Sequence, residues 1–453
     1  MTDAAPSLAP ALKTLIIRLH FYIGLLVGPF ILFAALTGTL YALTPAIEHA
    51  VYHEALTATN APGAERATLA EQISAAQAYR DDDAAPSAVR PASELGATTR
   101  IMFADPALGA GEHRAIFIDP TTLEVHGDLT VYGTSGVLPL RRIIDQTHRQ
   151  LLQGDIGRLY SELAASWLWL AALCGLAIWA FSPSPKVDPS KHTRSARRLR
   201  TRRHHSTLGL ILLIGLLALS ATGMTWSQYA GANFFAVLKA GGWGTPRVSL
   251  VLDGPQVQDP HADHKAAGTA QDGVDSAAFD RVLAAARSAG LDAGKIEVIA
   301  PAPGQAWKVR EVDRSWPSQV DEVAIDPASF ALLDRVRFSD YPLPAKLTRW
   351  GIDGHMGILF GLPNQLLLAA LGIGIIVMVC WGYAMWWRRR SAAGAGQTLW
   401  RALLQVPPMG QAIIASIALV LGFIMPVMGV SLALFLVIDG VRTIAAVRRS
   451  VAA

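Results

Sequence analysis

The feature that most constrains this chain is a histidine followed at fixed distances by a glycine and a Thr-Gly pair, a pattern that occurs twice. His20 precedes Gly24 by four residues, and His205 precedes Gly209 by four. In each copy the Thr-Gly pair begins seventeen residues after the histidine, and the residues between them are mostly apolar. A duplicated apolar span of this length predicts a protein built from a repeated membrane-crossing unit.

A second histidine is repeated in the same way. In both copies an arginine lies six residues before it and a glycine six residues after it, namely Arg142, His148 and Gly154 in the first and Arg349, His355 and Gly361 in the second. The chain therefore carries four histidines in two equivalent pairs. Duplication of a structural unit is one explanation, and a ligand site shared by equivalent helices is the other.

Composition indicates a polytopic membrane protein. Hydrophobic residues make up 52% of the 453 and charged residues 16%, with a mean hydropathy of +0.33, which is too apolar for an ordinary soluble protein. The formal charge is only +4, yet eight basic residues stand between Pro183 and His205 against the single acid Asp188. Because apolar spans flank this run, it indicates a cytoplasmic loop that follows the positive-inside bias, and no nucleic-acid contact is expected.

Four apolar stretches are long enough to cross a bilayer, which takes about 20 residues; they are Ile17–Leu43, Leu159–Phe181, Leu208–Trp226 and Leu362–Trp387. The first is too long for a signal-peptide core and lacks a convincing cleavage site, so we expect a retained anchor. A last stretch, Gln411–Ile438, is interrupted by Pro426 and Gly429 and predicts a hairpin of two short helices. Six helices with both termini in the cytoplasm keep every basic cluster on one side.

The segments between the first and second spans and between the third and fourth are predicted to face the periplasm. Each contains alternating apolar residues around an Asp-Pro turn, at Asp119-Pro120 and at Asp326-Pro327, which predicts a β-hairpin. Helical patterns precede the turns at Ser74–Tyr79 and Ser276–Ala289. We therefore expect each segment to form a small α+β lobe.

The predicted fold is a polytopic α-helical membrane protein with two parallel helix–lobe–helix repeats, which supply four core helices, and a C-terminal helical hairpin. The residue numbers of the two copies differ by 185 at the first histidine, and by 207 at both the Asp-Pro turn and the second histidine. Both copies begin on the cytoplasmic side, so an axis along the membrane normal relates them. The predicted domains are helix 1 at 15–45, lobe 1 at 46–155, helix 2 at 156–182, the basic loop at 183–205, helix 3 at 206–228, lobe 2 at 229–354, helix 4 at 355–390 and the hairpin at 409–446.

The paired histidines predict two membrane-embedded haems. Neutral imidazole is a good iron ligand, and two axial histidines leave no open coordination position, which suits electron transfer rather than oxygen chemistry. The two cysteines, Cys174 and Cys380, lie in apolar spans, and no Cys-x-x-Cys-His motif occurs. The haems are therefore expected to be non-covalent haem b.

The positions of the four histidines along their helices divide them into an inner and an outer site. We expect His20 and His205 to ligate an inner haem, and His148 and His355 an outer one. His204 adjoins His205 and is the alternative inner ligand. The arginines at equivalent positions are candidates to balance the haem propionates, with Arg18 and Arg203 inside and Arg142 and Arg349 outside.

Other polar groups carry weaker signals. His261 and His264 have metal-compatible side chains but lie in a loop-like insertion, and His49 and His53 are expected to be interfacial. No nucleotide-binding glycine motif and no nucleophile–base constellation stands out, so no catalytic side chain is assigned. Cytoplasmic electrons then have to come from a separate reductase, a soluble donor or the quinol pool.

Four motifs spread over Leu15–Arg390 form a recognisable constellation. They are His20 with its Thr-Gly pair, the two Ile-Asp-Pro hairpins, His148-Arg-Gln-Leu-Leu-Gln-Gly-Asp-Ile-Gly-Arg-Leu, and Trp386-Trp-Arg-Arg-Arg. Together they resemble the PepSY-associated transmembrane helix family, and the terminal hairpin from Met409 is similar to that of longer members. The resemblance implies PepSY-like lobes in an iron-regulated inner-membrane protein. The best-understood type in this family carries b-type haem and reduces ferric siderophores at the periplasmic face.

The four repeated histidines and the family resemblance together predict a haem-dependent ferric-siderophore reductase of the bacterial inner membrane. Its expected partners are a ferric siderophore, a cytoplasmic electron donor or quinol, the lipid bilayer and periplasmic iron-binding proteins. Two alternatives stay open. A siderophore permease needs no haem, and a PepSY-type signalling or protease-regulating protein uses its lobes to bind polypeptide. Neither alternative explains why the four histidines share depth and spacing.

Overall fold

The computed structural model describes residues 8–59, 65–133, 136–182, 193–252, 274–389 and 398–451. They form two compact units. A helical unit draws on Met1–Ala42, Gln146–Gly242 and Gln365–Ala453, and a sheet unit on Leu43–Asp145 and Trp243–Asn364. His261, His264 and the predicted insertion around them lie outside the described residues, as does the first part of the basic loop.

Five of the described helices are long and apolar enough to cross a membrane. The first runs through α1 (Leu8–Tyr22), the π-helical turn η1 (Ile23–Val27) and α2 (Gly28–Ala42), and the others are α7 (Gly154–Phe181), α8 (Arg194–Met224), α12 (Leu362–Arg389) and α15 (Pro426–Val451). A shorter apolar helix, α14 (Pro408–Ile424), precedes α15. The prediction of a largely helical membrane protein is thus confirmed.

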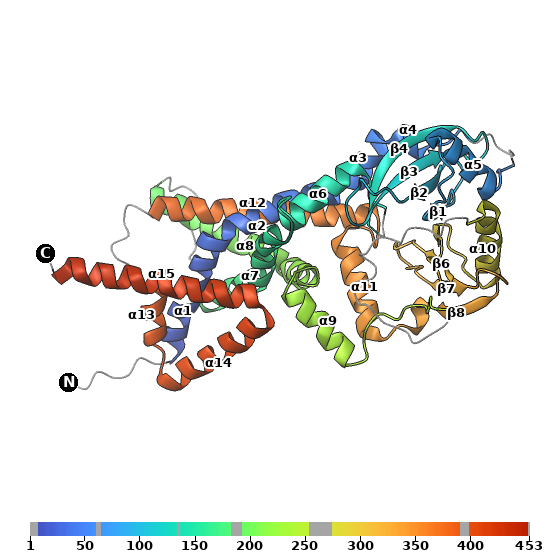
Figure 1. The fold of residues 1–453 in the computed structure, drawn as a ribbon. Helices are drawn as coiled ribbons and strands as arrows, with labels where there is room; N and C mark the ends of the chain where they lie inside the picture. Colours follow the sequence, from blue (N-terminus) through green and yellow to red (C-terminus); the bar gives the residue numbers. More distant parts are fainter. Residues whose placement is uncertain are drawn as a thin grey trace. The chain divides into compact units, whose positions relative to one another are not determined.

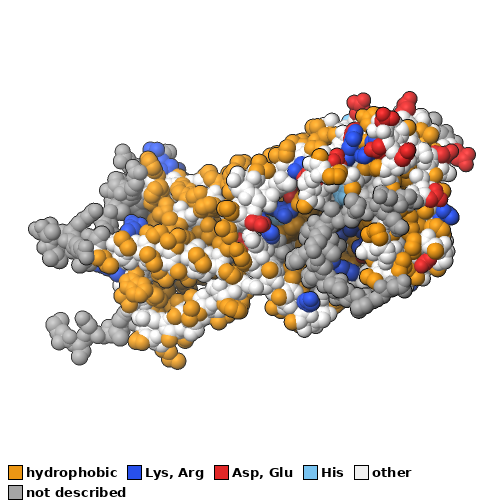
Figure 2. Space-filling view, in the orientation of Figure 1, with side chains coloured by type: hydrophobic (Ala, Val, Ile, Leu, Met, Phe, Trp, Pro, Cys, Tyr) orange, Lys and Arg blue, Asp and Glu red, His pale blue; other side chains and the backbone are white. Residues whose placement is uncertain are grey.

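The surface of the helical unit is apolar, as a bilayer requires. Its core packs Ile23, Trp167 and Leu371 from three different spans. In contrast, Ile214 and Phe423 are more than four-fifths exposed, at 82% and 83%. Figure 2 shows hydrophobic side chains covering much of the visible face of the helices, whereas carboxylates gather over the sheet unit. Outward-facing apolar side chains of this kind are stable only against lipid.

The C-terminal helices are tied together and to the first span. Between α14 and α15 a Cβ added to Gly429 would lie only 2.7 Å from the Cα of Gly422, so these two glycines allow close helix contact. Asp439 in α15 is fully buried. Its carboxylate accepts hydrogen bonds from the Tyr22 hydroxyl of α1 and from the backbone N–H of Trp400 in α13 (Leu399–Leu404).

The sheet unit contains one antiparallel sheet of eight strands in the order β4-β3-β2-β1-β5-β6-β7-β8 (Figure 1). The strands are β1 (Ala88–Arg90), β2 (Thr99–Phe103), β3 (Glu112–Ile118), β4 (Val125–Tyr132), β5 (Ile296–Ile299), β6 (Trp307–Glu311), β7 (Glu322–Ile325) and β8 (Leu332–Val336). The two segments predicted as separate lobes thus contribute four strands each to a single sheet. Their Asp-Pro turns join β3 to β4 and β7 to β8.

The halves of the sheet meet at β1 and β5, where Val89 is the register partner of Val298. Beside this seam the buried carboxylate of Glu297 accepts from Arg90 and Arg310, each at 2.5 Å. One ion-paired acid therefore bridges strands from both halves.

Two helices, α5 (Leu69–Arg80) and α10 (Ser276–Ser288), cover one face of the sheet together (Figure 1). The Asp280 carboxylate of α10 accepts from the backbone N–H groups of Leu69 and Ala70, at 2.8 and 2.9 Å. These groups are unpaired within α5 because they open the helix. Beneath the helices Phe279 packs edge-on against Trp307, with ring centroids 4.8 Å apart, so the two halves share one core.

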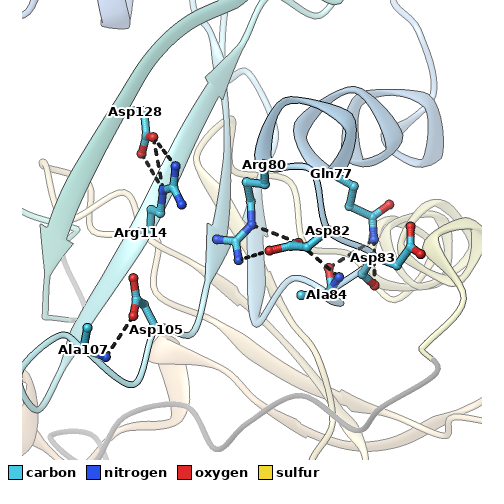
Figure 3. A network of polar contacts seen from close by, with 9 residues as sticks. All are labelled: Gln77, Arg80, Asp82, Asp83, Ala84, Asp105, Ala107, Arg114 and Asp128. Carbon is cyan, nitrogen blue, oxygen red and sulfur yellow. Dashed lines mark hydrogen bonds and ion pairs between the residues drawn. The ribbon is translucent and has the colours of Figure 1, made fainter.

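Shorter elements connect these parts. They are α3 (Thr44–Val51), α4 (His53–Leu56), α6 (Pro139–Gln150), α9 (Ala230–Ala240), the 3-10 turn η3 (Phe338–Asp340) and α11 (Leu343–His355). In the first half, partly exposed charges pair locally (Figure 3). There Arg114 of β3 points at Asp128 of β4, and Arg80 at the end of α5 holds Asp82.

Candidate functional site

Within the helical unit, the predicted inner histidines lie side by side. His20 comes from α1 and His205 from α8, and their ring centroids are 6.3 Å apart with an angle of 79° between the ring planes. Both side chains are partly buried. The structure therefore brings together two residues that are far apart in the sequence and that occupy equivalent places in its two copies.

Backbone carbonyls hold both rings in the same way. The Nδ1 atom of His20 lies 3.0 Å from the carbonyl oxygen of Ala171 in α7, and that of His205 lies 3.1 Å from the carbonyl oxygen of Met378 in α12. A carbonyl oxygen only accepts, so each Nδ1 carries the proton and each Nε2 keeps its lone pair. The two carbonyls occupy equivalent positions, because each follows the second histidine of its copy at the same spacing along the chain.

The separation of 6.3 Å between the His20 and His205 ring centroids can be compared with that of two imidazoles bound to one metal. With metal–nitrogen bonds of about 2 Å and about 1 Å from each nitrogen to its ring centre, two imidazoles on opposite sides of a metal have centroids roughly 6 Å apart. An Nδ1 bound to a carbonyl is the usual support for a ligating histidine. Among the described residues no three His, Cys, Asp or Glu side chains gather into a metal cluster.

Glycines leave space around the inner pair. A Cβ on Gly24, which lies in the π-helical turn, would meet nothing within 4 Å. A Cβ on Gly175 would lie 3.4 Å from Cε1 of His20, and one on Gly209 would lie 3.3 Å from the Met378 side chain. Single π turns inside α-helices are frequent at functional sites.

The neighbouring polar residues take different positions. His204 is exposed, and its ring lies against Trp381 at a centroid distance of 5.8 Å, whereas His205 faces His20. Arg203 is exposed, and Arg18 is partly buried.

Of the predicted outer histidines, His148 lies at the end of α6 in the helical unit. Its Nδ1 is 3.0 Å from the Thr37 hydroxyl, and a Cβ added to Gly38 would lie only 3.0 Å from its Cε1. The Tyr160 hydroxyl donates to the His148 carbonyl. The repeated Thr-Gly pair thus has a local role in the first copy, since the threonine contacts the histidine and the glycine makes room for it.

His355 closes α11 in the sheet unit and is partly buried. His148 and His355 belong to different compact units, so their pairing stays a prediction.

The outer arginines have carboxylate partners that sequence reasoning missed. Arg142 pairs with Glu112 of β3. The Nε atom of Arg349 lies 3.0 Å from Asp353, a fully buried acid that also pairs with Arg314. The pairing of Asp353 with Arg349 could have been predicted from the sequence, because Asp353 stands one helical turn after Arg349. Glu112 had none, since it reaches Arg142 only through the fold.

A comparison with protein-family models finds one match over most of the chain. The model described as the PepSY-associated TM region matches residues 17–389. A search of curated proteins found no significant match. The matched range contains all four histidines of the two predicted pairs.

Proposed function

Since the chain belongs to the PepSY-associated TM region family, we propose that it is a di-haem b oxidoreductase of the bacterial inner membrane. It passes electrons from the cytoplasmic side to a periplasmic ferric siderophore, and ferrous iron is released for uptake. In this proposal two parallel helix–lobe–helix repeats surround the haems, both termini are cytoplasmic, and the sheet unit is periplasmic.

One observation carries the proposal, namely the arrangement of His20 and His205. Their rings stand at the separation of two axial ligands, and equivalent carbonyls fix the same tautomer in both. A haem held between the two histidines would require this equivalent geometry in both copies of the pattern. A permease or a polypeptide-binding signalling protein does not require such an arrangement.

The protein's own residues orient the ligands and exclude competing chemistry. The Ala171 and Met378 carbonyls keep each Nδ1–H engaged, which would leave the Nε2 atoms of His20 and His205 to hold a metal. When bound, a haem held by His20 and His205 would supply one-electron transfer. Apolar packing by Ile23 and Trp167, both fully buried, keeps water away from this region. For the outer site, Thr37 and Gly38 set the position of the His148 ring.

Release of iron follows from coordination chemistry. Oxygen ligands of a siderophore are hard donors that favour the small, highly charged ferric ion, and one-electron reduction weakens this binding. In this proposal the reaction requires no nucleophile or general base from the protein.

The test is an oxidised and a dithionite-reduced visible spectrum of detergent-purified protein, with haem quantified per chain. We expect two low-spin b-type haems. His205→Ala is expected to remove the inner haem and leave the outer one, whereas the matched control His204→Ala retains both. Protein that lacks haem after expression with ample haem supply would overturn the proposal in favour of a permease or signalling protein.

The outer site is tested by Gly38→Ala. The added methyl group would lie 3.0 Å from Cε1 of His148 and is expected to displace the ring, which removes the outer haem signal alone. Gly440→Ala in α15 is the control, because its Cβ meets nothing within 4 Å. Both changes raise helix propensity, so a general loss of folding does not explain a selective spectral change.

A further inference from the structure

The first half of the sheet unit contains a cavity of about 210 Å³ that the proposed electron transfer does not use. Its wall comes from α3, α4, β2 and the chain before α6, and the lining residues are Pro45, Glu48, His49, Leu56, Arg100, Gly136, Val137, Leu138 and Arg141. The volume is roughly that of seven water molecules in liquid water. The cavity thus accommodates a small polar group, or one arm of a larger molecule.

Arg100 is the distinctive residue of this wall. It stands directly opposite Arg90 on the neighbouring strand, an arrangement of like charges that destabilises a sheet. Its guanidinium donates to the Gly136 carbonyl at 3.0 Å and lies over the Phe117 ring. No carboxylate among the described residues lies within ion-pair distance of Arg100. Burial and the nearby Arg90 charge lower its pKa to about 10, which leaves it charged at pH 7.

The two nearby acids are already shared with other arginines. Glu297 holds both Arg90 and Arg310, and Glu48 lies 3.6 Å from Arg141. Among the charged residues that line the cavity, Arg100 and Arg141 stand beside one acid, Glu48, so the formal charge of the lining is +1. An anion entering the cavity would meet uncompensated positive charge in a partly desolvated place.

In the second half of the sheet, the cation at the position equivalent to Arg100 has an acidic partner. Strand register makes Lys308 the counterpart of Arg100. Arg100 is the register partner of Phe117, and Lys308 is the register partner of Ala324. Each of these two partners stands two positions before the acid of the Asp-Pro turn in its own half. Lys308 lies 3.0 Å from Glu322. The place of Glu322, four positions before the turn, is taken in the first half by Ala115, which is fully buried and apolar. The first half thus keeps the cation and lacks its acid.

We infer that this cavity binds a carboxylate arm of the iron chelate, with Arg100 as the principal contact and Arg141 as the second cation of the lining. The inference rests on the proposed function for the identity of the chelate, but the anion site itself does not. Arg100 is then a specificity-determining residue, which favours chelates with free carboxylates over neutral or cationic ones. A planar guanidinium suits a carboxylate because it donates two parallel hydrogen bonds.

Binding is tested with citrate on the purified full-length protein by isothermal titration calorimetry. Wild-type protein is expected to bind citrate, and Arg100→Gln to bind it at least about tenfold more weakly. Arg114→Gln is the matched control, since it removes one arginine from the same half of the sheet at an exposed ion pair. Arg100→Lys, which retains the charge, is expected to recover part of the affinity.

Reduction assays then separate this inference from the proposed function. Arg100→Gln is expected to raise KM for ferric citrate by a larger factor than KM for the cationic trihydroxamate ferrioxamine B, so that the preference of the protein for the carboxylate chelate falls. Citrate binding without reduction of any chelate would contradict the oxidoreductase and leave the anion site standing. Wild-type protein that fails to bind citrate, unaltered binding by Arg100→Gln, or equal displacement by inorganic phosphate would overturn the site.

Discussion

The two halves of the eight-stranded sheet share a register but differ in their charges. In the first half Arg114 of β3 pairs with Asp128 of β4 at 2.6 Å. At the equivalent positions of the second half, Asp321 and Arg335 lie 3.8 Å apart with the charges exchanged. Because this ion pair occurs with either polarity, we infer that it stabilises the sheet and does not bind a ligand. By contrast, Lys308 has its acid and Arg100 has lost it, which marks the first half as the half with a binding role.

In the helical unit, by contrast, the two copies hold their inner histidines in the same way, although a π-helical turn follows His20 and α8 continues as an α-helix after His205. His20 and His205 each place Nδ1 on a carbonyl oxygen, and these carbonyls are equivalent residues of α7 and α12. A shared ligand explains why both copies keep one geometry. In the sheet unit the charged residues of the two halves can differ, because a substrate needs only one binding face.

The largest effect is expected where the halves join. Replacing Glu297 by Ala leaves Arg90 and Arg310 buried at the seam without their common acid. Breaking a buried ion pair on one side typically costs about 3–5 kcal/mol, so the free energy of unfolding of the sheet unit should fall by that order. Chemical denaturation followed by tryptophan fluorescence measures it. A loss below about 1 kcal/mol would mean that the apolar seam alone holds the halves together.

The same acid predicts a loss of stability at low pH. Burial raises the pKa of Glu297, but the charges of Arg310 and Arg90 outweigh it and hold the pKa at about 2. Because the folded-state pKa lies below the ordinary value of 4.5, the stabilisation is complete above that value and is lost as the pH falls from 4.5 towards 2.

Thermal unfolding between pH 7 and 3 measures this contribution. In Glu297→Gln the decrease of the melting temperature below pH 4.5 should be smaller than in the wild type, because the variant has no carboxylate to protonate at the seam. An identical acid profile in the variant would show that the two arginines do not depress the pKa of Glu297.

An intermediate effect is expected from Glu322→Ala, which makes the second half resemble the first. Lys308 loses its partner at 3.0 Å, and a hydrogen bond to a charged group contributes about 2 kcal/mol. If the missing acid is what creates an anion site, citrate binding should rise above one site per chain, although more weakly than at Arg100. Stability measurements and calorimetry on one preparation test both points. A stable variant with one citrate per chain would show that a pocket is needed besides the free cation.

Local patterns predicted much of this fold, and long-range pairing did not follow from them. The apolar spans and the Asp-Pro hairpins are encoded in contiguous residues, so their periodicity and turn chemistry are visible in the sequence. The junction of Val89 with Val298 is not, because a short strand pairs there with a segment from the other half of the chain. For the same reason spacing indicated His20 and His205, whereas Glu112 as the partner of Arg142 emerged only in three dimensions.

The smallest effect is expected from exchanging the charges of the exposed pair in the first half. Arg114→Asp alone places two acids next to each other and should cost less than about 1 kcal/mol, since partly exposed pairs are screened by water. Adding Asp128→Arg recreates the arrangement of Asp321 and Arg335, so the double variant should return to wild-type stability.

A double-mutant cycle by chemical denaturation at low and high salt measures the coupling energy. Recovery that disappears at high salt would confirm a purely electrostatic pair, whereas a double variant less stable than either single one would mean that the first half requires this polarity. In that case the reversed ion pair would no longer show that charges in this sheet can be purely structural. Only the cavity would then distinguish the binding role of the first half from the second half.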